Sequence, residues 1–245
     1  MKGNIYTKAT RLRYFYHMNR GVQMGDKGIL IVRFLIFVIG LLIMAYGLDL
    51  MIVAHFGATP WDVLHVGLFQ HFGLSIGTWS IIIGFFVLGI SAIFMHQWPK
   101  LGAYLNMLLV GIFMDMFLNL PFMITPGFII VKVLMFIAGV VINGIGMGIY
   151  ISAQLGAGPR DSFMLVLTKL TGWKISHVRR LMEVLVLIIG WLLGGPVFWG
   201  TIIFCVTIGT IVGIALPKCQ FLTDAILERL RNKKWNKDIN RGASV

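Results

Sequence analysis

Two copies of a short motif contain the residues with the clearest chemical potential. The motif reads Phe56-Gly-Ala-Thr-Pro-Trp-Asp62 in the first half of the chain and Leu155-Gly-Ala-Gly-Pro-Arg-Asp161 in the second. Proline suits the first position of a helix because its missing N–H costs nothing there, so we expect helices to begin at Pro60 and Pro159. Asp62 and Asp161 then lie in the first turn, where a carboxylate meets free N–H groups and the positive end of the helix dipole.

A helix start of this kind can bind an anionic or polar group. We therefore take the residues Pro60, Asp62, Pro159, Arg160 and Asp161 as candidates for substrate binding or gating. In the alternative interpretation the two carboxylates only cap their helices. Arg160 could hold an anionic group with its planar fork of donors, or it could be one more positive charge on the inner side of a membrane.

His65 joins these candidates because it lies three residues after Asp62, on the same helical face. A histidine there could make a pH-sensitive or substrate contact, or it could be a polar residue at a membrane interface. A metal site needs more ligands in fixed geometry, so we expect no metal. The sequence contains no nucleotide fingerprint, zinc-protease helix or nucleophile motif, and we expect neither a cofactor nor enzymatic activity.

Two further carboxylates, Asp49 and Asp115, lie inside apolar segments, where ionisable groups are costly and often functional. Both lie toward the same end of their segments, so they could face each other as a proton or cation site. They are our candidates for ion coupling. Alternatively, both carboxylates reach the membrane interface and have no such role.

The segments that position these residues are strongly apolar. The 245 residues are 58% hydrophobic and 12% charged, yet the net charge is +12. Ordinary soluble domains are about 45–50% apolar and about 25% charged, so this composition excludes a soluble or disordered chain. A membrane-spanning helix needs about 20 apolar residues. We predict an all-α polytopic membrane protein with six spans, at residues 29–53, 75–95, 101–120, 128–152, 181–195 and 197–217.

The basic residues predict the orientation of these spans. Nineteen of the 21 Lys and Arg lie before residue 29, between 96 and 100, between 153 and 180, or after 217, and none lies in 55–74 or 121–127. Because basic loops stay in the cytoplasm, we expect both termini to be cytoplasmic. The charge is then explained by topology and by attraction to anionic lipids at the inner face, not by nucleic-acid binding. The sequence does not predict the oligomeric state.

The chain also contains an internal repeat. Residues 32–62 align with 131–161 at an offset of 99, and the matches include Gly40 with Gly139 and Gly47 with Gly146. Each copy covers three spans, so the second copy is inverted relative to the first. We expect a basic segment at 1–28, three-helix repeats at 29–120 and 128–217, and a basic tail at 218–245. The helices predicted at 60–71 and 159–171 are too short to cross a bilayer. They are either interfacial or re-entrant.

The repeated motif resembles the YczE-like family of bacterial integral membrane proteins, which is related to the YitT-like group. The residues of the resemblance are Gly57, Ala58, Pro60, Trp61 and Asp62, with Gly156, Ala157, Gly158, Pro159 and Asp161. It covers about residues 28–218 and implies a multi-pass protein of the bacterial plasma membrane. It implies no substrate or catalytic residue.

Inverted repeats are common in secondary transporters, where the substrate binds at the repeat interface near the membrane midplane. We therefore expect a small secondary transporter or permease that works by alternating access and takes a small-molecule substrate. The alternative from another class is a non-transporting membrane scaffold or accessory protein. The sequence alone leaves both open.

Overall fold

The computed structural model describes residues 27–95, 98–156, 158–173 and 175–242. Within these residues the chain forms helices and no strands, which agrees with the predicted all-α class. The helices are α2 (Lys27–Val53), α3 (Pro60–Phe72), α4 (Ile76–Met95), α5 (Leu101–Leu118), α6 (Ile129–Ser152), α7 (Pro159–Thr171), α8 (Ile175–Leu192) and α9 (Trp199–Gly242). The predicted N-terminal basic segment up to residue 26, Ala157 of the second motif and residues 243–245 of the tail lie outside the described residues.

Five of these helices, α2, α4, α5, α6 and α9, are long and apolar enough to cross a membrane. The sequence predicts six spans, and the difference is α8. This helix covers most of the span predicted at 181–195, but Arg179, Arg180 and Glu183 lie in its first half. Because charged side chains are costly in hydrocarbon, α8 does not qualify on composition.

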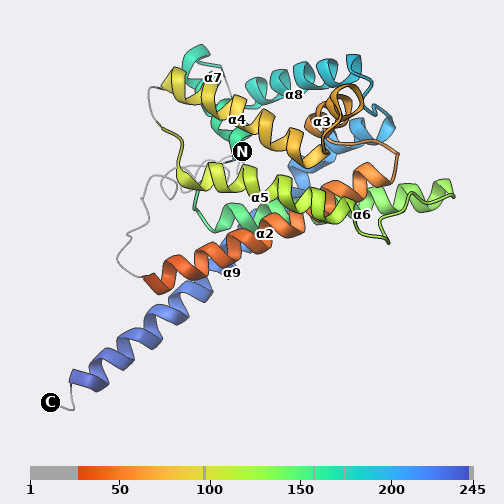
Figure 1. Cartoon of the computed structure of the whole chain (residues 1–245). Coiled ribbons are helices and arrows are strands. Elements are labelled where there is room, and N and C mark those ends of the chain that lie inside the picture. The colour runs from red at the N-terminus through yellow and green to blue at the C-terminus, as the bar shows by residue number, and fades with distance from the viewer. Residues whose placement is uncertain (1–26, 96–97, 157, 174, 243–245) are drawn as a thin grey trace, which may run out of the picture.

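The last span also differs from its prediction. The apolar pattern predicts an end at residue 217, but α9 continues through Pro217 and forms one helix of 44 residues. A proline inside a helix removes a backbone hydrogen bond and tends to kink the helix, yet the helix continues beyond it. The predicted boundary between the second repeat and the tail therefore lies inside a helix, and α9 extends well beyond the other helices (Figure 1).

The centre of the fold is a close antiparallel contact between α2 and α6. Glycines allow the two backbones to approach, because a Cβ on Gly47 would lie 2.4 Å from the Asn143 amide nitrogen. The remaining contacts run in opposite directions along the two helices and pair Gly40 with Tyr150, Met44 with Gly146, and Met51 with Gly139. Small residues commonly mediate such packing between membrane helices. Around this contact, α5 packs on α2 and α9 packs on α6.

The shorter helices gather along one side of α2, α5 and α6 (Figure 1). α3 packs mainly on α8, and α7 packs mainly on α4. Each short helix of one half therefore packs on a longer helix of the other half. Gly190 of α8 permits one of these contacts, since a Cβ there would lie 2.6 Å from the Leu64 nitrogen.

The turn before α3 is fixed to the start of α9. Gly57 has a φ of 145°, in a region that favours glycine. The Gly200 amide donates a hydrogen bond to the Phe56 carbonyl at 3.0 Å, and the Ala58 amide donates to Thr201 Oγ1 at 3.3 Å. These hydrogen bonds attach the turn before Pro60, in the first half of the chain, to the start of α9 in the second half.

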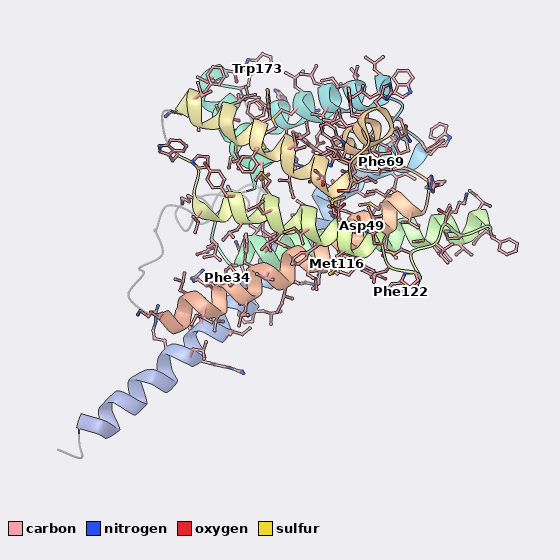
Figure 2. The ribbon with its side chains drawn as sticks, viewed as in Figure 1. Phe34, Asp49, Phe69, Met116, Phe122 and Trp173 are labelled. Carbon is pink, nitrogen blue, oxygen red and sulfur yellow. The ribbon has the colours of Figure 1, made fainter. Side chains whose placement is uncertain are left out.

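Large apolar side chains cover the outer surface of the helices. Phe34, Phe69, Phe122 and Trp173, which are labelled in Figure 2, are all exposed. Large exposed apolar surfaces are unusual for soluble monomers and are the expected surface of helices in lipid. Asp49 differs, because it is completely buried among the helices.

Candidate functional site

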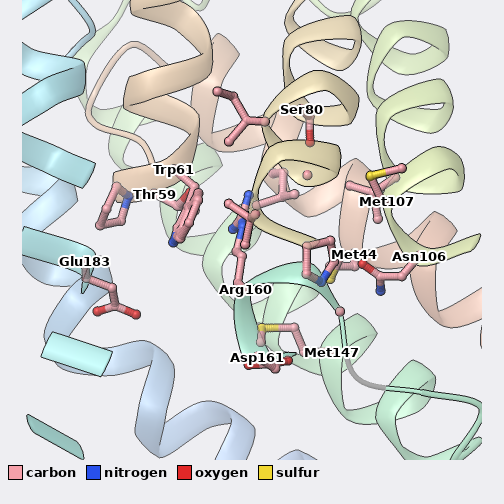
Figure 3. A pocket seen from close by; sticks show the side chains of 18 of the residues that line it. Met44, Thr59, Trp61, Ser80, Asn106, Met107, Met147, Arg160, Asp161 and Glu183 are labelled. Atoms are coloured by element: carbon pink, nitrogen blue, oxygen red, sulfur yellow. The ribbon is translucent and has the colours of Figure 1, made fainter. Parts of the chain in front are cut away.

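A cavity of about 120 Å³ lies at the centre of the molecule (Figure 3). Each of the eight described helices contributes at least one residue to its wall. A water molecule takes a share of about 30 Å³ in liquid water, so the cavity has room for several waters or a small solute. The wall combines apolar side chains, such as Met147 and Phe204, with polar and charged ones.

The two short helices point their N-termini at this cavity. Thr59, Pro60 and Trp61 at the start of α3 line it, as do Pro159 and Arg160 at the start of α7. Both helices begin at the proline, as the motif predicts. Their free N–H groups and dipoles therefore converge on one space, although about 100 residues separate the two motifs in the sequence.

Asp62 is completely buried at the start of α3. Its amide donates to Thr59 Oγ1 at 3.1 Å, and its Oδ2 accepts a hydrogen bond from the same hydroxyl at 2.5 Å. The Thr59 hydroxyl therefore caps α3, and its hydrogen bond to Asp62 uses only one carboxylate oxygen. Oδ1 has no hydrogen-bond partner and faces His65 Nδ1 at 3.5 Å and Arg160 Nη2 at 3.9 Å. Asp62 therefore joins the two motifs electrostatically through its contact with Arg160.

His65 is buried and lines the cavity, as its candidate role requires. Burial lowers the pKa of its imidazole from the ordinary value of 6.5, against the opposing effect of the nearby Asp62 carboxylate. The neutral form is therefore favoured at neutral pH. A neutral imidazole can both donate and accept hydrogen bonds.

Arg160 lies over the ring of Trp61, with 4.9 Å between the guanidinium carbon and the ring centroid (Figure 3). The two residues occupy the same position in the two motifs. The separation of Arg160 from Asp62, 3.9 Å, is too long for a hydrogen bond. The guanidinium side chain is 36% exposed while it lines the cavity. It therefore retains N–H donors that the Asp62 pair does not use.

The other charged groups of the cavity differ in how strongly they are hydrogen-bonded. Asp161 Oδ2 accepts from the Tyr150 hydroxyl at 3.4 Å, a long and weak contact. Arg179 Nε donates to Glu183 Oε1 at 3.1 Å, one helical turn apart on α8. Among the charged residues that line the cavity, Arg160 and Asp161 are the pair whose hydrogen-bonding capacity is least used within the described chain.

Two buried amides on the cavity wall each have one atom without a hydrogen-bond partner. These atoms are Asn106 Nδ2, a donor on α5, and Asn143 Oδ1, an acceptor on α6. The other end of the Asn143 amide donates to the Met44 carbonyl at 3.4 Å. Buried polar atoms are rarely left unpaired, and an exception calls for an explanation such as bound water or ligand. Neither residue was among the predicted site residues, although an amide inside an apolar segment is a signal in itself.

The predicted ion-coupling residues Asp49 and Asp115 are not on the cavity wall. Asp115 Oδ1 accepts from the Gly77 amide at 2.8 Å, and its Oδ2 accepts from the Ser75 hydroxyl. It thus caps the start of α4 from a neighbouring helix. Asp49 is fully buried, and neither carboxylate oxygen has a hydrogen-bond partner. A role for either residue in ion coupling stays a prediction.

Many wall residues occur as pairs at the repeat offset. Pairs separated by 99 residues are Met44 and Asn143, Leu48 and Met147, Thr59 and Gly158, Pro60 and Pro159, Trp61 and Arg160, His65 and Met164, Ser80 and Arg179, Ile83 and Met182, and Gly84 and Glu183. Asn106 with Phe204 and Val110 with Ile208 are separated by 98 residues. Equivalent positions of the two halves therefore face the same space, but their chemistry differs, since Arg160, Arg179 and Glu183 all come from the second half.

Comparisons with known proteins identify the family. A family model described as a family of unknown function, DUF6198, matches residues 31–217. The chain is 46% identical to the uncharacterised membrane protein YczE of Bacillus subtilis over 204 residues, which is 82% of this chain and 93% of that protein. It is 30% identical to an uncharacterised Haemophilus influenzae protein over 183 residues, 72% of this chain and 80% of that protein.

A second Bacillus subtilis protein, YyaS, is 28% identical over 186 residues, which is 76% of this chain and 92% of that protein. No solved structure matches the chain. Five of its described helices are able to cross a bilayer. From the family model and these relatives, the chain belongs to the DUF6198 family and is a YczE-like membrane protein, as its paired Gly-Ala-x-Pro-x-Asp motifs indicate.

Proposed function

We propose that the protein is a small secondary transporter that moves a polar solute by alternating access between two inverted halves. The observation that supports this most is the central cavity, where two helix N-termini meet and the wall is built from equivalent positions of both halves. Transporters with inverted repeats bind their substrates in this kind of place, between discontinuous helices. The unpaired donor and acceptor atoms on the wall suit a polar solute.

The contacts between α2 and α6 support a pseudo-two-fold axis. Gly40 contacts Tyr150. The counterparts of these two residues in the other half are Gly139 and Met51, and they contact each other in the same way. Gly47 with Asn143 and Gly146 with Met44 form a second such pair. An inverted duplication would produce this exchange, because each half would then present the same face to the other.

We further propose that α3 and α7 are re-entrant and not interfacial. The first two turns of α3, Pro60–Gly67, are buried, whereas Phe69 and Phe72 near its end are exposed. A helix lying in the interface would bury one side along its whole length. A helix of 13 residues is about 20 Å long, so it can reach the interior from one face without crossing a bilayer of about 30 Å.

The proposed orientation places both termini in the cytoplasm of a bacterial cell, with α8 as a sixth crossing. The basic residues support this orientation. If α8 did not cross the membrane, the basic segment 153–180 and the basic tail would lie on opposite sides of the membrane. Single cysteines at Ile124 and Lys169, in a variant without Cys205 and Cys219, test this with impermeant reagents. We expect labelling of 124 from outside only and 169 from inside only.

Transport is tested by flux of a library of small polar solutes into proteoliposomes. We expect uptake of at least one solute, with strong loss in Asp62→Asn and Asp161→Asn variants that still fold. The exposed carboxylate Asp224 provides a matched control, Asp224→Asn, which should transport normally. If no solute crosses, the transport proposal fails and the alternative, a non-transporting membrane scaffold, is favoured.

A further inference from the structure

The charges around the cavity constrain the solute that it can hold. Two carboxylates, Asp161 and Glu183, line it with two guanidinium groups, Arg160 and Arg179, and a third carboxylate, Asp62, lies outside the wall at 3.9 Å from Arg160. The formal balance is therefore one negative charge. Each helix N-terminus is equivalent to about half a positive charge, and two of them point at the cavity. These contributions cancel to about zero, which favours a solute without net charge.

An ion of either sign fits this balance poorly. A phosphate-like dianion would face the carboxylates of Asp161 and Glu183, and Arg160 is already loosely paired with a third carboxylate, Asp62. A simple cation would lie next to the Arg160 guanidinium and two positive helix ends. A fully apolar solute would leave Asn106 Nδ2 and Asn143 Oδ1 without partners, which is unfavourable for buried polar groups. What remains is a net-neutral molecule with strong polar groups.

The polar groups on the wall offer both signs to such a molecule. Arg160 retains free donors, and Asn106 Nδ2 is a buried donor without a partner. Asp161 accepts one long hydrogen bond, at 3.4 Å from the Tyr150 hydroxyl, besides its attraction to Arg160 and Arg179, and Asn143 Oδ1 is a buried acceptor without a partner. Arg160 and Asp161 are adjacent on the first turn of α7 and both line the cavity, so a positive and a negative group are presented to the same space.

We infer that the cavity binds a small zwitterion, whose anionic group is held by Arg160 and Asn106 and whose ammonium group is held by Asp161 and Asn143. A volume of about 120 Å³ has room for a solute of the size of the smallest amino acids. The inference rests on the proposed function, since it names the substrate class of the same cavity. It is testable by binding alone, without any flux measurement.

The experiment compares glycine with its two halves, acetate and methylammonium, on the detergent-purified protein by isothermal titration calorimetry. Glycine should bind with a Kd at least tenfold lower than that of either singly charged ion, and L-alanine should bind comparably. Equal binding of acetate or methylammonium would overturn the inference, as would no binding of glycine or L-alanine. This comparison uses the unaltered protein, so it does not depend on the folding of any variant.

Variants locate the binding site. Arg160→Gln and Asp161→Asn should each raise the Kd for glycine at least tenfold. Lys169→Gln, on the exposed end of α7, and Asp224→Asn make the same charge changes away from the cavity and should change the Kd less than twofold. Equal effects of cavity and control variants would overturn the assignment to this cavity.

The two proposals can fail separately. If glycine binds as expected but does not cross proteoliposome membranes, the zwitterion site stands and the transport function fails. If another class of solute is transported and glycine does not bind, transport stands and the zwitterion inference is wrong.

Discussion

The two central glycines of the α2–α6 contact, Gly47 and Gly146, provide a sharp test of how the halves are joined. A Cβ on Gly47 would lie 2.4 Å from the Asn143 nitrogen, and a Cβ on Gly146 would lie 2.4 Å from the Met44 nitrogen. Ordinary contacts of a Cβ begin near 3.4 Å, so the helices would have to separate locally by about 1 Å. Because the obstacles are backbone atoms, no side-chain rotation relieves them.

The expected cost follows from two opposing terms. Inserting an extra carbon into a close-packed interface costs about 1–3 kcal/mol. Alanine is better than glycine in a helix by about 0.5–1 kcal/mol. Gly209→Ala in α9 isolates the second term, since a Cβ there meets nothing within 4 Å. We expect Gly47→Ala and Gly146→Ala to be about 1–3 kcal/mol less stable than this control.

The assay is unfolding of the purified protein in mixed micelles with increasing SDS, followed by circular dichroism. The two variants should be destabilised by similar amounts, because their contacts are equivalent in the two halves. The reasoning would be refuted if either variant were as stable as Gly209→Ala. Costs that differ by more than about 2 kcal/mol would contradict the equivalence of the two halves.

Three further predictions concern single groups. Thr59→Ala should destabilise the protein by about 2–3 kcal/mol in the same assay, because it removes a helix cap and both hydrogen bonds to Asp62. Thr59→Ser keeps the hydroxyl and should be nearly neutral. Equal losses of stability in the two variants would contradict the capping role of the hydroxyl. Asp115→Ala should open the first turn of α4, seen as faster hydrogen exchange at Gly77, while the first turn of α3 is unchanged; unchanged exchange at Gly77 would disprove the cap. For His65, the pKa in the folded state is lowered from 6.5, so just below pH 6.5 the unfolded state binds more protons than the folded state and the protein should lose stability as the pH falls. His65→Gln should remove this part of the pH dependence of stability, and an unchanged pH profile in this variant would count against the prediction.

Local signals in the sequence predicted the helix starts well. A proline at the first position and a side chain or glycine before it specify where α3 and α7 begin, because capping depends on residues close in sequence. The predicted family and the all-α class follow from signals of the same kind, namely the repeated motif and long apolar runs.

Signals that depend on tertiary contacts were not predictable. The Asp115 carboxylate caps the start of α4, about 40 residues away in the sequence, by accepting from the Gly77 amide, whereas its apolar surroundings suggested an ion site. The approach of Arg160 to Asp62 joins positions 98 residues apart, and nothing local indicates it. The predicted fifth span begins at residue 181, whereas α8 begins at Ile175. The difference arises because the charged residues in the first half of α8 interrupt the apolar pattern on which the prediction was based.

The most direct test of the central claim is the accessibility of the cavity from each side of the membrane. Ser80 lines the cavity, so Ser80→Cys, in a variant without Cys205 and Cys219, places a thiol at the proposed solute site. An impermeant thiol reagent is applied to oriented vesicles, from outside in one sample and from inside in another. Alternating access predicts labelling from both faces, with the ratio of the two rates shifted by a bound solute. Labelling confined to one face, with and without solute, would contradict the account.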